Sequence, residues 1–281
     1  MAILIPVEDR VSTYPGRVKL TPVSGQTNVY DMVRADVPVQ EGTPLNKALL
    51  DQKAYTLTGD VTVYVSLSGD DASGDGSSAA PFASIQAAVN ALPKCLGGHT
   101  ATINITAGTY NERVLVEGFY GGNLVIGEPG RTVVVRGFSI DNSSTVTLHI
   151  SNLTWASGFS GTILRLGNGS DVIIGSGMTV RCENSSEVAV GVTYGSRLIA
   201  NGATLTVLNC TQTAIRATYG AHAVLATVTG SGNTSVGMLA ELGAIISYTT
   251  STLTSTGGNA SRTGGRILIG SGSEMANASM V

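Results

Sequence analysis

The feature that most constrains the fold is a short segment that recurs from residue 121 onward. Each copy is a small turn, usually containing glycine, followed by a short apolar strand. The first residues of successive copies are 22, 26, 26, 25, 23 and 21 positions apart, namely Gly121, Ser143, Gly169, Gly195, Gly220, Gly243 and Gly264. A second segment recurs between them, with Gly177 and Gly202 25 residues apart. Repeats of this length, built from short strands without helices, predict a parallel β-helix whose coils stack about 4.8 Å apart.

Composition agrees with stacked β structure and excludes several other classes of protein. Glycine accounts for 36 of 281 residues, but it does not occupy every third position and proline accounts for only 8, which excludes collagen. Charged residues make up 12 %, which excludes a coiled coil and a charge-rich disordered tail. With 5 % aromatic residues, the core must consist of Val, Ile, Leu, Ala and Thr, most of which favour strands. Because parallel crossovers are almost always right-handed, the predicted fold is all-β, a right-handed, single-stranded parallel β-helix.

Turn signals and periodicity divide the chain into three regions. Residues 1–60 carry turn signals and one short helical candidate, Leu45–Lys53, and are predicted to form an extended attachment region whose order depends on a partner. Residues 61–120 contain strands and an amphipathic helix, Ser84–Leu92, which is predicted to cap the first coils. Residues 121–281 are predicted to form the β-helical shaft.

Charge and cysteine content argue against several partners and cofactors. The 16 basic and 19 acidic residues give a net charge of −3, which offers no electrostatic basis for binding nucleic acid. No apolar run is long enough for a signal peptide or a membrane span, so neither export through a signal peptide nor membrane insertion is expected. The three cysteines, Cys95, Cys182 and Cys210, lack metal-ligand spacing and are interpreted as buried structural thiols. No cofactor is expected.

Residues 62–116 resemble the opening of pectin-lyase-like β-helix proteins, especially pectin methylesterases. The matching elements are a Gly/Asp loop, the helix Ile85-Gln-Ala-Ala-Val and the strand Ala107-Gly-Thr-Tyr-Asn-Glu112. The resemblance implies the same right-handed β-helix with a short helix before its first coils. The resemblance indicates no specific enzymatic activity, because many virion and surface proteins share this opening.

A second resemblance lies in the amino-terminal region. The segments Tyr14-Pro-Gly-Arg-Val-Lys-Leu-Thr-Pro-Val and Glu41-Gly-Thr-Pro-Leu-Asn are similar to amino-terminal segments of bacteriophage and prophage tail proteins. This resemblance implies a tail fibre or tailspike located in the virion tail and assembled in the bacterial cytoplasm. It also implies a homotrimer that contacts tail or baseplate proteins through residues 1–60 and recognises a cell-surface glycan through the shaft.

The alternative function is a polysaccharide-active enzyme on the same fold, either an esterase, a lyase or a glycosidase. Asp171-Val-Ile-Ile-Gly resembles the segment that supplies a catalytic aspartate in pectin methylesterases. In the repeat, however, unrelated residues hold the same coil position: Asn123, Thr145, Arg197, His222, Ile245 and Arg266. Asp171 is therefore interpreted as one member of an outward-facing row. A glycosidase needs two carboxylates about 5 to 9.5 Å apart, and Asp171 and Glu187 are the catalytic candidates for this alternative.

Two further groups of residues are candidates for binding. Asp71, Ser73 and Asp75 match the first half of a calcium-binding loop, although Phe82 occupies the position where the loop requires Glu, so a plain turn is the competing interpretation. The aromatic candidates for glycan binding are Trp155, Tyr194 and Tyr219, for which packing within the fold is the competing interpretation.

Overall fold

The computed structural model describes residues 11–12, 18–24, 30–34, 38–40, 56–154, 162–258, 260–270 and 273–274. The chain divides into two compact units, which are Ala2–Ala54 and the larger unit Tyr55–Val281. In the smaller unit, β1 (Val11–Ser12) pairs antiparallel with β4 (Pro38–Gln40), and β2 (Val18–Pro22) pairs antiparallel with β3 (Tyr30–Arg34). The helix predicted over Leu45–Lys53 lies outside the described residues.

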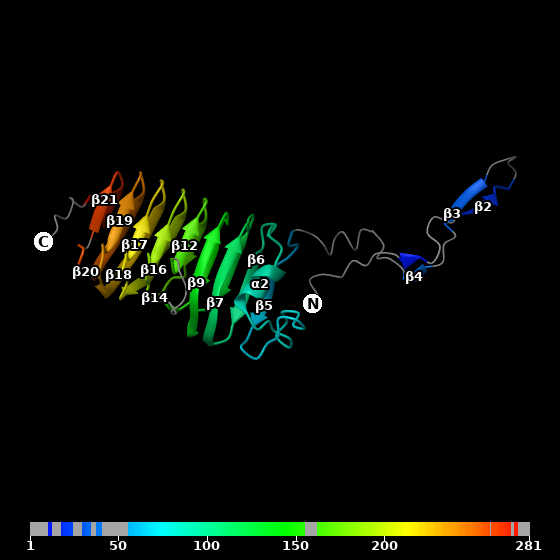
Figure 1. Ribbon diagram of the computed structural model, residues 1–281, viewed down its shortest axis with the longest axis horizontal. Helices are drawn as coiled ribbons and strands as arrows, with labels where there is room; N and C mark the ends of the chain where they lie inside the picture. The colour runs from blue at the N-terminus through cyan, green and yellow to red at the C-terminus, as the bar shows by residue number, and fades with distance from the viewer. Residues whose placement is uncertain are drawn as a thin grey trace. The chain divides into compact units, whose positions relative to one another are not determined.

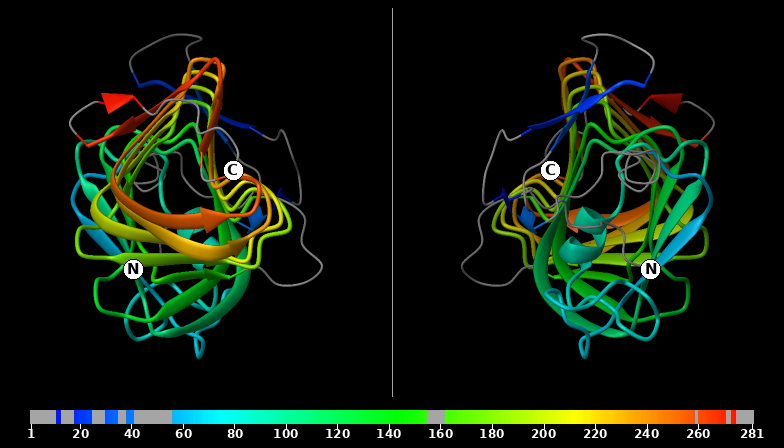
Figure 2. Two further views of the ribbon diagram at one scale, coloured as in Figure 1. Left: turned by 90° about the vertical axis from the view of Figure 1, so that its left-hand side faces the viewer. Right: turned by 90° about the vertical axis from the view of Figure 1, so that its right-hand side faces the viewer.

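The larger unit is a right-handed parallel β-solenoid, as the repeat predicts (Figure 1). Each full coil has three faces, which we call A, B and C in chain order. Viewed along the axis, the coils superpose (Figure 2). Face A consists of β5 (Val61–Val65), β6 (Thr100–Ile105), β8 (Asn123–Gly127), β10 (Val146–His149), β13 (Asp171–Ile174), β22 (Arg266–Ile269) and the first parts of β16 (Arg197–Leu208), β18 (His222–Asn233) and β20 (Ile245–Ser255).

Faces B and C continue each coil around the axis. Face B consists of the first parts of β7 (Gly108–Glu117) and β9 (Val133–Asp141), the strands β11 (Asn152–Thr154) and β14 (Thr179–Glu183), and the second parts of β16, β18 and β20. Face C consists of the second parts of β7 and β9, followed by β12 (Leu164–Gly167), β15 (Val190–Val192), β17 (Ile215–Ala217), β19 (Met238–Glu241) and β21 (Ala260–Thr263). β23 (Ser273–Glu274) pairs antiparallel with β22.

The register of face A agrees with the sequence repeat at every step. The residue three positions after the start of each repeat copy pairs with its equivalent on the next coil, in the order Leu124, Val146, Val172, Leu198, Ala223, Ile246 and Ile267. All seven side chains are buried. Because neighbouring residues of a strand point to opposite faces of the sheet, this register sends an apolar row into the core and leaves the alternate positions on the surface.

Glycine turns the chain at the corner where face C meets face A. Asn168 and Gly169 both have positive φ, 54° and 75°, and Tyr194 and Gly195 repeat this pair on the next coil with 52° and 68°. Two consecutive residues in the left-handed region form a tight turn that suits Asn and Gly and strains most other side chains. Glycine at the second position therefore allows each coil to change direction within two residues.

The helix α2 (Ile85–Ala91) covers the beginning of the solenoid and explains the residues that resemble the pectin methylesterase opening (Figure 1). Ser84 caps the helix by accepting a hydrogen bond from the Ala87 N–H at 3.1 Å. The Glu112 carboxylate accepts hydrogen bonds from the Ile85 and Gln86 N–H groups at 2.8 and 2.9 Å. Burial raises the pKa of Glu112, and these two hydrogen bonds oppose that shift.

Gln86 replaces a neighbouring strand for β7. Its side-chain amide donates to the Leu115 carbonyl at 3.1 Å, and its side-chain oxygen accepts from the Leu115 N–H at 2.7 Å. These two bonds imitate the pairing that another coil would provide and protect the free edge of the first face C strand. Ile85, Ala88 and Val89 of the same helix are buried. The residues that resemble the pectin methylesterase opening therefore cover the free edge at the beginning of the solenoid.

We predict that Gln86→Ala destabilises the solenoid by about 1–2 kcal/mol, because two hydrogen bonds to Leu115 are lost at a sheet edge. Thermal and urea denaturation followed by circular dichroism measure this loss. Asn90→Ala is the matched control, since Asn90 is exposed on the same helix and accepts one bond from Gln86. We expect a change of less than about 0.5 kcal/mol for the control, and equal stability losses in the two variants would contradict the capping role.

Candidate functional site

An exposed aromatic column follows the corner between faces C and A. The first turn residue of successive coils is Asn168, Tyr194, Tyr219 and Leu242, and each turn is joined to the next by a backbone hydrogen bond of 2.9 to 3.0 Å. Tyr194 is 53 % exposed and Tyr219 52 %. Their rings stack with centroids 4.7 Å apart and an interplanar angle of 5°. The structure therefore brings two of the predicted binding residues together on the surface, in contact with each other.

A polar groove of about 320 Å³ lies on face C beside the beginning of this column. Seven residues line it: Leu115, Val116, Glu117, Ser139, Asp141, Arg165 and Asn168. Glu117 and Asp141 hold like positions on neighbouring coils, because β7 and β9 pair in register there. Asn168 belongs both to the groove and to the corner column, where Tyr194 follows it on the next coil. The groove and the tyrosine pair thus form one continuous surface.

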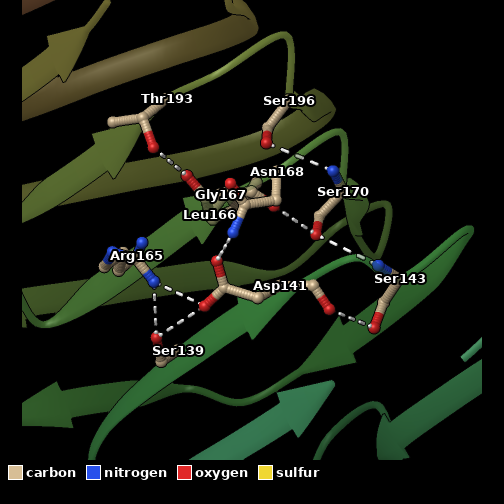
Figure 3. A network of polar contacts seen from close by, with 10 residues as sticks. All are labelled: Ser139, Asp141, Ser143, Arg165, Leu166, Gly167, Asn168, Ser170, Thr193 and Ser196. Atoms are coloured by element: carbon tan, nitrogen blue, oxygen red, sulfur yellow. Dashed lines mark hydrogen bonds and ion pairs between the residues drawn. The ribbon is translucent and has the colours of Figure 1, made fainter. Parts of the chain in front are cut away.

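Asp141 is the centre of the groove's hydrogen-bond network (Figure 3). Its Oδ2 accepts from Arg165 Nη1 at 2.5 Å and from the Ser139 hydroxyl at 3.2 Å, and its Oδ1 accepts from Asn168 Nδ2 at 3.0 Å. Arg165 Nη1 also donates to the Ser139 hydroxyl at 3.1 Å. Hydrogen bonds from Ser139, Arg165 and Asn168 therefore hold the Asp141 carboxylate in a defined orientation relative to the Arg165 guanidinium.

Gly167 makes room for this network. A methyl group at Gly167 would lie 2.4 Å from Asp141 Oδ1 and 3.0 Å from Arg165 Nη2. Gly167 occupies the outward position after Asp141 on face C, where β9 and β12 pair in register. The carboxylate can lie over the β12 strand because the side chain that would normally stand there is absent.

A row of buried serines supports the corner from inside (Figure 3). Ser143, Ser170 and Ser196 hold like positions on successive coils and are at most 1 % exposed. The Ser143 N–H donates to the Ser170 hydroxyl at 3.2 Å, and the Ser170 N–H donates to the Ser196 hydroxyl at 3.1 Å. Each hydroxyl satisfies a buried backbone N–H that turns away from the regular ladder. These hydrogen bonds therefore connect the turns that carry Asn168 and Tyr194 to each other and to the preceding coil.

This arrangement has the chemistry of a polyol-binding surface. Aromatic rings provide an apolar platform, while carboxylate, guanidinium and amide groups accept and donate hydrogen bonds in complementary directions. The stacked rings of Tyr194 and Tyr219 continue the column from Asn168, and Asn168 also lines the groove.

The two catalytic candidates lie at different corners of the coil. Asp171 opens β13 on face A, where its carboxylate accepts two hydrogen bonds from Arg197, at 2.8 and 3.0 Å. Asp171 and Arg197 are register partners, so both belong to the outward-facing row that the repeat predicts. Glu187 lies in the loop between β14 on face B and β15 on face C. A catalytic role for either residue stays a prediction.

The three candidate metal ligands lie in the loop before α2. Asp71 accepts hydrogen bonds from the Ala83 and Ser84 N–H groups at 2.7 and 2.9 Å, which anchors the beginning of the helix. The Ser73 N–H donates to Asp70 at 3.3 Å. Asp75 accepts from the Ser77 N–H at 2.9 Å, and its hydrogen bonds with Ser77 lower its pKa to about 2. The part of the chain that the structure describes contains no group of three or more His, Cys, Asp or Glu residues able to hold a metal ion.

Three remaining predictions concern Trp155, the cysteines and membrane-spanning segments. Trp155 lies outside the described residues. Cys182 and Cys210 are buried free thiols, as predicted, whereas Cys95 is half-buried. Within the described ranges, no helix has the length and apolar character needed to cross a membrane.

Sequence reasoning missed Glu117, Arg165 and Asn168 as members of a site. A sequence signal for the corner column was present in the four residues that precede each aligned turn. The strand and turn read Leu164-Arg-Leu-Gly-Asn-Gly, Val190-Gly-Val-Thr-Tyr-Gly, Ile215-Arg-Ala-Thr-Tyr-Gly and Met238-Leu-Ala-Glu-Leu-Gly. This alignment by itself places Asn168, Tyr194 and Tyr219 in one column.

No protein-family model, curated protein or solved structure matches this chain. The class of protein is therefore given by the fold itself, a parallel β-solenoid closed at its beginning by one short helix.

We predict that Gly167→Ala disrupts the groove and destabilises the solenoid by about 1–3 kcal/mol, because the added methyl group overlaps the Asp141 carboxylate. Urea denaturation measures the loss. Gly59→Ala is the control, since a methyl group there meets no atom within 4 Å and Gly59 does not have positive φ. A Gly167→Ala protein as stable as the wild type would show that the Asp141 network is absent in solution.

Proposed function

We propose that this chain is a tail fibre or tailspike component of a bacteriophage or a phage-like particle. Residues 1–60 attach it to tail or baseplate proteins, and the solenoid forms a rigid shaft that recognises a cell-surface glycan. The particle carries the chain in its tail as a homotrimer assembled in the bacterial cytoplasm. The attachment role rests on the Glu41-Gly-Thr-Pro-Leu-Asn resemblance and on the separate amino-terminal unit.

The observation that carries the recognition role is the exposed Tyr194–Tyr219 stack beside the Asp141–Arg165 groove. Two aromatic rings about half exposed to water at this corner lose apolar contact with solvent when a ligand covers them. A β-solenoid places such groups at fixed spacing along its axis, so a polymer with repeating sugars can contact several coils at once. The nearby carboxylates and guanidinium favour a ligand rich in hydroxyl groups.

Cell binding tests this proposal. We expect the fluorescently labelled chain to bind whole host cells, and periodate oxidation of the cell surface to abolish binding. Tyr194→Ala and Tyr219→Ala should each weaken binding about tenfold, which corresponds to about 1.4 kcal/mol. Tyr30→Ala is the matched control, because Tyr30 is 53 % exposed and belongs to the separate amino-terminal unit. Binding that survives periodate and both stack substitutions would refute glycan recognition at this corner.

A second candidate function, a polysaccharide-active enzyme, is favoured by one observation. Glu117 and Asp141 are carboxylates at like positions on neighbouring coils and line the same groove. Same-face carboxylates on adjacent strands fall within the range of separations that glycosidases use.

Turnover separates this candidate from simple recognition. If the groove is catalytic, the wild-type chain releases new reducing ends from host capsule, and Glu117→Gln lowers the rate at least about a hundredfold. Glu128→Gln is the control, because this carboxylate pairs with Arg131 and does not line the groove, and it should leave the rate unchanged. Intact polymer after prolonged incubation with the wild-type chain excludes the enzyme and leaves the binding role.

A further inference from the structure

The stacked tyrosines of the corner column have a backbone conformation that bulky side chains rarely adopt. Tyr194 has a φ of 52° and Tyr219 a φ of 54°, both in the left-handed region. Asn168 holds the same corner position with a φ of 54°, and asparagine tolerates this conformation better than tyrosine does. Backbone strain of this kind is found mostly at functional positions, where the surrounding structure enforces it. The corner thus carries two phenols at positions where the turn itself favours a small polar residue.

Hydrogen bonds between coils place the two rings in register. The Gly169 N–H donates to the Tyr194 carbonyl at 2.9 Å, and the Gly195 N–H donates to the Tyr219 carbonyl at 3.0 Å. The two tyrosines therefore hold like positions on neighbouring coils, which stack about 4.8 Å apart. Their ring centroids are 4.7 Å apart, and the ring planes are 5° from parallel. Because the ring separation matches the coil spacing, the backbone ladder sets the geometry of the stack.

Both phenols are open to solvent, and their neighbours in the column are inert to oxidation. Tyr194 is 53 % exposed and Tyr219 52 %. The column positions on either side of the pair are Asn168 and Leu242. Neither an amide nor an alkyl side chain gives up an electron readily. A one-electron oxidant in solution can therefore reach both phenols, and a radical formed on one ring has the other ring beside it.

We propose that Tyr194 and Tyr219 form an oxidative cross-linking site, at which the two phenols couple to dityrosine and join neighbouring coils covalently. The co-reactant is a one-electron oxidant of the peroxidase class, with hydrogen peroxide as the terminal electron acceptor. This inference concerns the covalent structure of the chain itself and stands whether or not the corner binds a glycan.

Coupling of the two phenols requires two one-electron oxidations. Each phenol gives one electron to the oxidant and its hydroxyl proton to water, which leaves a phenoxyl radical whose unpaired electron is shared between Oη and the two Cε carbons. The two unpaired electrons then form a C–C bond between one Cε carbon of each ring. The hydrogen on each bonded Cε leaves as a proton, and each Oη gains a proton, so both rings become aromatic again. The chain loses two hydrogen atoms in total, and one hydrogen peroxide is reduced to two waters.

The stack favours coupling within one chain over coupling between chains. Holding two reactants in contact converts a bimolecular step into a unimolecular one and raises their effective concentration by orders of magnitude. Exposed side chains rotate about their bonds within nanoseconds, which allows the two Cε carbons to approach bonding distance. We therefore expect a cross-link whose yield does not depend on protein concentration.

Treatment of the full chain with a haem peroxidase and hydrogen peroxide, followed by denaturation and peptide mapping, tests the inference. Trypsin cleaves after arginine, which places Tyr194 in peptide 182–197 and Tyr219 in peptide 217–262. The wild-type chain should yield these two peptides joined, with a mass two hydrogen atoms below their sum, together with dityrosine fluorescence. The intact product should keep the mobility of a single chain in denaturing electrophoresis.

Conservative variants identify the two phenols. Tyr219→Phe keeps an aromatic ring in the stack but removes the hydroxyl group, and should abolish both the joined peptide and the fluorescence. Tyr30→Phe is the matched control and should leave both signals unchanged, because Tyr30 is 53 % exposed in the separate amino-terminal unit. A covalent link between coils restricts the unfolded chain as a disulfide does, so the cross-linked wild-type chain should melt about 5–10 °C higher than the untreated chain.

Three results would overturn the inference. An oxidised wild-type chain without the joined peptide shows that the two phenols do not couple. A yield of joined peptide that rises with protein concentration shows that coupling takes place between chains. A cross-linked chain that melts at the same temperature as the untreated chain shows that the link does not hold the two coils together.

Discussion

The whole solenoid depends on backbone hydrogen bonds between like strands of successive coils. These bonds form only when each coil repeats the path of the previous one, so a residue at one position always lies beside its equivalent about 4.8 Å away. The aliphatic row from Leu124 to Ile267 fills the interior under this constraint. The same constraint produces the other rows, including the buried serines, the Asp171–Arg197 row and the tyrosine stack.

An edge remains wherever such stacking begins, and this chain covers it with α2. Glu112 binds the first N–H groups of the helix, and Gln86 binds the backbone of Leu115 in place of a preceding strand. These are the residues on which the similarity to pectin methylesterases rests. Their contacts show that the similarity reflects the closure of a β-solenoid, a requirement shared by proteins of many functions.

Charge is used sparingly along the shaft, and three of its ion pairs connect neighbouring coils. Arg165 pairs with Asp141, Arg197 with Asp171 and Arg216 with Glu241, each bridging neighbouring coils. Stacking places like positions next to each other, so an unpaired row of one charge would repel itself. Opposite charges on adjacent coils avoid this. The Asp141 pair lies in a groove that continues through Asn168 to the aromatic column, which makes it the centre of the proposed binding surface.

The repeat determined the class of fold and its register on face A, and the amphipathic segment Ser84–Leu92 determined the position of the capping helix. Turn glycines and inward aliphatic residues are local signals, and each coil must reuse them. It also placed Asp171 in an outward row with Arg197. The site required the tertiary structure, because Glu117, Asp141 and Arg165 are distant in sequence and meet only when three coils stack. The tyrosine stack and the space above Gly167 likewise depend on which side of the chain each residue occupies, and hydrogen bonding between coils decides this.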